Sequence, residues 1–185
     1  LFNLAVLAIA YVVLIGWPGE KQVVLPVAIG GPFSMTDQNG RIVSDETLKG
    51  TPYAIFFGYT HCPDVCPTTL GRLAQLRRKL GPDGDRFEII FVSVDPERDT
   101  RAAIGSYVAM FDTPIVALTG TPQQIAGIVK AFHVYYNKVP TGGGDYAVDH
   151  TASVFLMDAD GEFVTTIDHA ESEAMALAKL RRMIG

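Results

Sequence analysis

The sequence feature that most constrains the fold is a nearly continuous apolar run over residues 53–59 (YAIFFGY). Such a run is typical of a β-strand that is buried on both faces of a sheet. A stripe of leucines at helical spacing follows it (Leu70, Leu73, Leu76 and Leu80), and the change from a strand pattern to a helix pattern recurs along the chain. We therefore expect a single α/β domain with a mixed central sheet flanked by helices.

Local patterns predict the remaining elements in the order β-α-β-α-β-α-β-β-α after an N-terminal hairpin. The hairpin strands are residues 33–36 and 41–43, joined by a turn that contains Asn39-Gly40. The later strands are residues 87–94, 115–118, 153–157 and 162–167, and the later helices are carried by residues 104–111, 121–132 and 172–184. The stretch between the third helix and residue 153 shows neither the hydrophobic period of a helix nor that of a strand, and we expect it to be irregular.

The first 17 residues contain no charged side chain, and Asn3 is their only strongly polar one. We expect residues 1–17 to be a transmembrane anchor truncated at its start, with Trp17 at the membrane interface. Residues 18–32 then form a linker, and residues 33–185 form the folded domain. The alternatives are a buried core helix and a cleaved signal peptide, although residues 16–19 do not resemble a cleavage site.

The charge and the cysteine content of the chain exclude some classes of function. The chain has 15 Lys and Arg against 20 Asp and Glu, a formal net charge of −5, and it has no basic run. Binding of nucleic acid through phosphate neutralisation is therefore not expected. The 2 cysteines are too few for a disulfide-built scaffold, but they suffice for one redox pair or for two metal ligands.

The two cysteines lie in the sequence Thr60-His61-Cys62-Pro63-Asp64-Val65-Cys66-Pro67, between the buried strand and the leucine helix. Loops at the carboxyl ends of parallel strands carry the sites of open α/β folds. The adjacent helix N-terminus favours the thiolate, which is the form that binds metals and attacks disulfides. Two small buried side chains or a static disulfide are the alternatives for Cys62 and Cys66.

A metal site would need a third donor, and His150 is the best candidate among the four histidines. It precedes the strand at residues 153–157, which should lie beside the central strand, whereas His61, His133 and His169 belong to other segments. Two thiolates and one imidazole suit copper(I), while zinc would require a fourth donor. A surface or capping histidine remains the alternative for His150.

Two further motifs lie near these residues. The run Gly142-Gly143-Gly144 predicts a surface loop, which could also be mobile and bring His150 to the metal. The segment Asp95-Pro96-Glu97-Arg98-Asp99 leaves the sheet at the same edge as the cysteines. It is expected to turn the chain and cap the next helix, with support of the site or contact with a partner as a second reading.

Three motifs together resemble the Sco/SenC copper chaperones of cytochrome c oxidase assembly: FFGYTHCPDVCPTTL, FVSVDPERDT and VDHTASVFLMDADGEF. The resemblance covers the chain from about residue 33 to its end. It implies a thioredoxin-like fold with an N-terminal membrane anchor. It also implies that Cys62, Cys66 and His150 bind copper, as copper(I), copper(II) or both.

The resemblance further implies a place in the cell and a partner. The folded domain would lie in the bacterial periplasm or in the mitochondrial intermembrane space, anchored to the inner membrane. The partner would be the CuA domain of cytochrome c oxidase subunit II, with other copper chaperones or thioredoxin-like reductants as further partners. We expect a metallochaperone rather than an enzyme.

The alternative is a thiol-disulfide oxidoreductase that uses Cys62 and Cys66 to keep the CuA cysteines reduced. A peroxidase is not expected. No Thr stands three residues before either cysteine, and the one Trp of the chain, Trp17, lies in the expected anchor.

Overall fold

The computed structural model describes residues 28–185. The expected anchor at residues 1–17 and most of the expected linker therefore lie outside the described residues. No helix within residues 28–185 is long and apolar enough to cross a membrane.

The strands are β1 Ser34–Asp37, β2 Ile42–Ser44, β3 Tyr53–Gly58, β4 Glu88–Ser93, β5 Val116–Thr119, β6 Tyr136–Gly142, β7 Asp145–His150, β8 Val154–Met157 and β9 Phe163–Ile167. The α-helices are α2 Asp45–Leu48, α3 Val65–Lys79, α4 Arg101–Val108, α5 Pro122–Ala131 and α6 Glu173–Ile184, with 3-10 helices η1 Gly81–Arg86 and η2 Ala109–Phe111.

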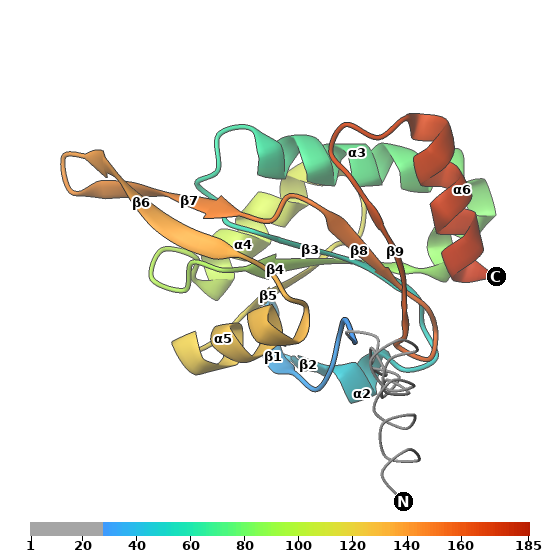
Figure 1. The fold of residues 1–185 in the computed structure, drawn as a ribbon, viewed down its shortest axis with the longest axis horizontal. Helices are drawn as coiled ribbons and strands as arrows, with labels where there is room; N and C mark the ends of the chain where they lie inside the picture. Colours follow the sequence, from blue (N-terminus) through green and yellow to red (C-terminus); the bar gives the residue numbers. More distant parts are fainter. Residues whose placement is uncertain (1–27) are drawn as a thin grey trace, which may run out of the picture.

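Seven of these strands form one mixed sheet in the order β2-β1-β5-β4-β3-β8-β9. Strands β3, β4 and β5 run parallel, β8 pairs antiparallel with β3, and β9 pairs antiparallel with β8. The expected mixed α/β domain and its N-terminal hairpin are confirmed. Because β3 lies near the centre with helices α3 and α6 above it and α5 below it (Figure 1), every one of its residues is buried.

The aromatic side chains of β3 divide the core between the two faces of the sheet. Phe56 packs on Phe91 of β4, with ring centroids 6.4 Å apart, and Phe91 packs on Tyr107 of α4. The next residue, Phe57, points to the opposite face and packs on Phe132, at the end of α5, with ring centroids 5.4 Å apart. This alternation explains why the apolar run has no polar interruption: both faces of β3 are core.

Helix starts follow the local sequence closely. The Thr121 side chain accepts from the backbone N–H of Gln124, and the Gln124 side chain accepts from the backbone N–H of Thr121, which closes a capping box with Pro122 in the first turn of α5. Ser172 caps α6 in the same region where the sequence predicts its start. Thr100, the residue directly after the segment at 95–99, caps α4.

The stretch expected to be irregular is in fact a β-hairpin. Strands β6 and β7 pair antiparallel in a separate two-stranded sheet, which projects from one end of the domain (Figure 1). The prediction failed because β6 is largely exposed and contains Pro140, so it has no hydrophobic alternation. Residues 142–144 form the tip with positive φ angles of 98°, 64° and 87°, whereas His150 pairs with Tyr136 at the opposite end. The glycine run is therefore a tight turn remote from His150.

Candidate metal centre

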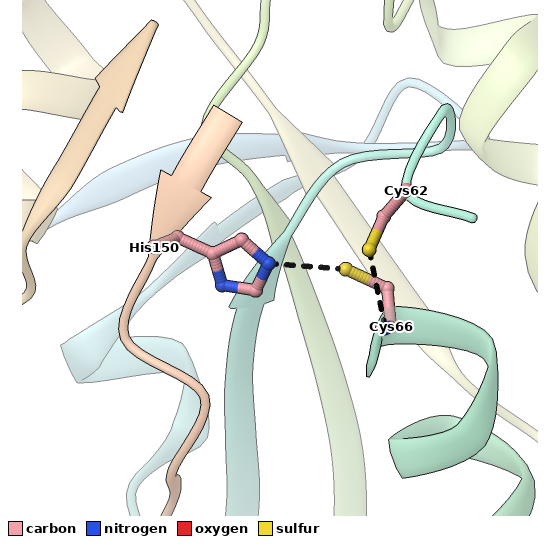
Figure 2. Close-up of side chains that lie close together, drawn as sticks. All are labelled: Cys62, Cys66 and His150. Carbon is pink, nitrogen blue, oxygen red and sulfur yellow. Dashed lines mark hydrogen bonds between the residues drawn. The ribbon is translucent and has the colours of Figure 1, made fainter. Parts of the chain in front are cut away.

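Three donor side chains converge where the hairpin meets the main sheet. The sulfurs of Cys62 and Cys66 and a ring nitrogen of His150 all lie within 4.8 Å of one another. Figure 2 shows the two cysteines approaching from the loop and first turn of α3, and His150 approaching from the end of β7. The structure thus brings together the three residues that the sequence singles out.

Local backbone geometry positions both cysteines. The segment at residues 59–64, called here the cysteine loop, joins β3 to α3, and Cys66 is the second residue of that helix. Asp64 occupies the N-cap position without a side-chain capping hydrogen bond. Instead the backbone N–H of Cys66 donates to the Cys62 Sγ at 3.4 Å, so the sulfur takes the place of a capping oxygen.

The two thiols have opposite acid–base properties. The adjacent Cys66 side chain is the main reason why the pKa of Cys62 falls to about 3, with help from the backbone N–H groups of Asp64 and Cys66 and against the effect of burial. The adjacent Cys62 sulfur, together with burial, raises the pKa of Cys66 far above its ordinary value of 9.0. Cys62 is partly exposed, while Cys66 is buried. The pair therefore holds one accessible thiolate and one buried thiol.

His150 presents an unprotonated nitrogen to the sulfurs. Its Nδ1 lies 3.0 Å from the carbonyl oxygen of Thr151, and since a carbonyl can only accept, Nδ1 carries the proton. In the neutral imidazole, Nε2 then keeps a lone pair, and it lies 3.3 Å from the Cys66 Sγ. Phe56 and Tyr59 pack against the imidazole ring edge-on, with centroids 5.8 Å and 6.0 Å away. The ring is thus oriented as a metal ligand requires.

Asp99 holds the cysteine loop against the end of β4. Its carboxylate is fully buried and accepts from the backbone N–H of Thr60 at 3.0 Å, from the Thr60 hydroxyl at 2.6 Å and from the Ser93 hydroxyl at 2.6 Å. Of the two readings of this segment, capping of α4 does not apply to Asp99, because Thr100 caps that helix. Its carboxylate instead supports the loop that carries the cysteines.

A hollow of about 260 Å³ opens beside the donors. It is lined on one side by the cysteine loop and on the other by β7, and Cys62 and His150 both face it. Asp64 and Asp149 stand on its rim and are exposed. The donors are therefore accessible to a small ion or to a docking protein from one direction.

The other three histidines contribute no donor to this group. His61 is exposed and contacts the Thr60 hydroxyl, and the His133 ring lies 3.2 Å from the carbonyl oxygen of Ala28. No fourth Cys, His, Asp or Glu joins the group within residues 28–185. Two soft sulfur donors and one imidazole match the preference of copper(I) better than the four-ligand preference of zinc.

Sequence reasoning missed several supporting groups. The Thr151 carbonyl, the Cys66 backbone N–H and the bonds from Thr60 to Asp99 carry no pattern of their own, because each depends on how distant segments meet in space. For Asp99 the sequence does offer a signal, because residues 95–99 follow a parallel strand and so leave the sheet at the same edge as the cysteines.

These features define a class of protein: a thioredoxin-like α/β domain with a Cys-Cys-His group at the end of its central strand. Residues 22–185 match the family described as SCO1/SenC. The chain belongs to the SCO1/SenC family, and the thioredoxin-like fold expected for residues 33–185 is confirmed.

Named relatives support this assignment. The structure of Bradyrhizobium japonicum ScoI with copper bound is 51% identical, has a TM-score of 0.78, and covers 84% of this chain and 99% of that chain. Yeast Sco1 with copper bound is 32% identical, has a TM-score of 0.78, and covers 85% and 88% of the two chains. The mitochondrial protein SCO1 homolog of Mus musculus is 41% identical over 139 residues, which are 74% of this chain and 49% of that protein. The chain spans about half the length of that curated relative.

Proposed function

We propose that this chain is a copper metallochaperone that binds one copper ion through Cys62, Cys66 and His150 and delivers it during assembly of cytochrome c oxidase. The observation that carries the proposal is the convergence of two sulfurs and an imidazole nitrogen within 4.8 Å, beside an open hollow. Solved relatives whose copper-bound forms share the fold support copper as the ion. Copper here is cargo, so the site must both hold it and release it.

The chemistry of the three donors suits a transferable ion. Cys62 is already a thiolate, so it can bind an arriving copper without first losing a proton. Cys66 must release its proton as the metal binds, because only the thiolate is a metal ligand. Three soft ligands leave copper(I) open to attack by the thiolates of a recipient, so transfer can proceed by ligand exchange.

The proposal includes a place and a recipient. Residues 1–17 anchor the chain in the bacterial inner membrane or the mitochondrial inner membrane, residues 18–32 form the linker, and residues 33–185 form the copper-binding domain in the periplasm or intermembrane space. The recipient is the CuA domain of oxidase subunit II. Support comes from the uncharged N-terminal sequence and from the role of the family in oxidase assembly.

The low pKa of the Cys62 thiol favours a second function, reduction of a target disulfide. The Cys62 thiolate attacks one target sulfur and forms a mixed disulfide, while the other target sulfur leaves as a thiolate and takes up a proton. Cys66 then loses its proton and attacks Cys62, which releases the second target thiol and leaves a Cys62–Cys66 disulfide. Two electrons pass to the target, and an external dithiol must reduce this chain again.

Copper binding by full chains with single histidine substitutions tests the leading proposal. We expect one copper(I) per wild-type chain and an imidazole contribution in the X-ray absorption spectrum. His150→Ala should lose that contribution and weaken binding by about tenfold or more, since even the loss of a residue that supports a ligand costs roughly 10- to 100-fold. His169→Ala, which removes an exposed ring outside the donor group, is the matched control. A wild-type chain that binds no copper tightly would contradict the proposal.

Stopped-flow thiol exchange separates the two functions. If the oxidoreductase is correct, the copper-free chain reduces a CuA-domain disulfide, and His150→Ala retains most of that rate. If the metallochaperone alone is correct, the copper-free chain leaves the disulfide intact and the copper-loaded chain transfers its ion to the reduced domain.

A further inference from the structure

The segment at residues 95–99, which leaves the carboxyl end of β4, touches both parts of the structure that carry the donors. Through Asp99 it binds the cysteine loop, as described above. Through Asp95 and Arg98 it binds the β6–β7 hairpin, which ends in His150. The hairpin shares no sheet with the rest of the domain, so these side-chain contacts help to set where it lies.

Tyr146 is the hairpin residue at the centre of these contacts. Its hydroxyl donates to the Asp95 carboxylate at 2.7 Å, and that carboxylate is fully buried. The Arg98 guanidinium stacks on the Tyr146 ring, with its central carbon 3.7 Å from the ring centroid, and donates to the Tyr146 carbonyl at 2.9 Å. On the same ring, the Lys138 ammonium lies 4.5 Å from the centroid.

Arg98 is itself held in place. Its Nε donates to the Asp95 carboxylate at 2.5 Å, and one of its Nη atoms donates to Asp145 at 2.9 Å. Its side chain is only 18% exposed, so the ion pair with Asp95 is sheltered from solvent and weakly screened. A planar guanidinium that bridges a buried carboxylate, an aromatic face and a backbone carbonyl fixes the orientation of all three.

Tyr146 and His150 lie on one face of β7. Side chains alternate along a strand, so Tyr146, Val148 and His150 point the same way. Val148 is buried between them, against the core. A strand rises about 3.4 Å per residue, so a change in the tilt of β7 at Tyr146 moves His150 relative to the sulfurs.

We propose that Tyr146 is a positioning residue for the copper site: through its contacts with Asp95 and Arg98 it holds β7 in the orientation that brings His150 Nε2 to the two sulfurs. The proposal rests on the proposed copper-binding function. Tyr146 makes no hydrogen bond to Cys62, Cys66 or His150, and the proposed route from it to the copper runs along β7 to His150. The alternative route, through residues 95–99 to the cysteine loop, is the one that the test below separates from it.

A double-mutant cycle on the full chain tests that route. Copper(I) affinity is measured by competition with a chromogenic chelator for wild type, Tyr146→Ala, His150→Ala and the double variant. We expect Tyr146→Ala to weaken binding roughly 10- to 100-fold, the usual range for a residue that orients a ligand. In the His150→Ala background the same substitution should change affinity less than about twofold, since coupled residues are not additive.

The matched control is Tyr135→Ala. Tyr135 is 61% exposed and precedes Tyr136, the residue that pairs with His150. Tyr135 is therefore closer than Tyr146 to His150 along the hairpin, yet its side chain makes none of the contacts above. We expect Tyr135→Ala to bind copper with wild-type affinity. That result would show that the loss of an aromatic ring near the hairpin does not by itself weaken copper binding.

The imidazole contribution to the X-ray absorption spectrum is the second measurement. Tyr146→Ala should reduce it at equal copper occupancy, and Tyr146→Phe, which keeps the stacked ring but not the bond to Asp95, should show a smaller loss and retain the fold. Equal effects of Tyr146→Ala with and without His150, or an unchanged imidazole signal in both variants, would overturn the positioning role alone. A wild-type chain without tight copper binding would overturn the proposed function as well.

Discussion

The Cys66 Sγ lies 3.3 Å from His150 Nε2, although 84 positions separate the two residues in the chain. One belongs to the first turn of α3 and the other to the end of β7, so the contact joins the main sheet to the separate hairpin. Because the donors already face one another, little rearrangement of side chains is needed to surround an ion.

The low pKa of Cys62 predicts an unusual pH profile for alkylation. An ordinary thiol loses about tenfold in thiolate for each pH unit below 9, whereas Cys62, with a pKa of about 3, stays ionised down to about pH 5. Iodoacetamide should therefore modify Cys62 at a nearly constant rate between about pH 5 and 8, with Cys66 much slower, as followed by mass spectrometry. Cys66→Ala removes the main cause of the shift, so its Cys62 should regain a rate that rises with pH; a profile identical to wild type contradicts the explanation.

Gly58, the last residue of β3, is required for space. A Cβ placed there would lie 2.7 Å from the Cys66 Sγ and 3.1 Å from Phe91 Cε2, and neither neighbour is free to move in the core. Gly58→Ala should lower the free energy of unfolding by about 1–3 kcal/mol in urea titrations and also weaken copper binding. Gly71→Ala in α3 meets nothing within 4 Å and should instead stabilise the fold by about 0.5–1 kcal/mol with unchanged copper binding. Equal stability of the two variants would show that this reading of Gly58 is wrong.

The hydroxyl of Thr60 should contribute to the stability of the cysteine loop. Thr60→Val keeps the side-chain shape but removes the donor to the buried Asp99 carboxylate, so we expect a loss of about 1–3 kcal/mol in the free energy of unfolding. Thr60→Ser restores the donor and should recover most of that loss. If both variants unfold at the same denaturant concentration, the hydrogen bond is not the stabilising interaction.

Arg77 stabilises the fold at a distance from the donors. Its buried guanidinium donates to the carbonyl oxygens of Gly84, Phe87 and Pro114 at 2.8 Å, 2.7 Å and 2.8 Å. Arg77→Leu leaves these acceptors without that donor and should cost about 3 kcal/mol or more, measured by thermal or urea unfolding. Arg78→Leu, one position along and exposed, should cost less than about 0.5 kcal/mol. Both variants should bind copper like wild type while folded.

The central part of the fold was predictable because its buried positions recur in the sequence with the period of a strand or of a helix. Residues 53–59 are apolar at every position since both faces of β3 are core, and the capping box at Thr121 marks the start of α5 without any knowledge of the tertiary structure. The approach of Cys62, Cys66 and His150 followed from topology: the end of β3 and the segment before β8 meet because those strands are neighbours. Their role as copper ligands stays a prediction.

The hairpin and its contacts were not predictable in the same way. Most residues of strand β6 are exposed to solvent. Because the strand has no buried face, residues 136–142 do not alternate between apolar and polar side chains. The hydrogen bonds that Thr60 donates to Asp99 and Tyr146 donates to Asp95 span 39 and 51 positions. They join polar side chains, which carry no periodic signal. Only the position of the acidic segment after a parallel strand indicated that it would lie near the cysteines.

The separation of the hairpin from the main sheet has a thermodynamic consequence. A copper ion bound by His150 of the hairpin and by the two cysteines of the main domain opposes local opening of β6 and β7. It raises the free energy of that opening by RT ln(1 + [Cu]/Kd), which is about 4 kcal/mol at a copper concentration of 1,000 times Kd. Amide hydrogen exchange that proceeds through opening of the hairpin should therefore slow as copper occupancy rises. By the same linkage, a recipient that binds the opened hairpin withdraws one of the three ligands and lowers the affinity for copper without disturbing the core.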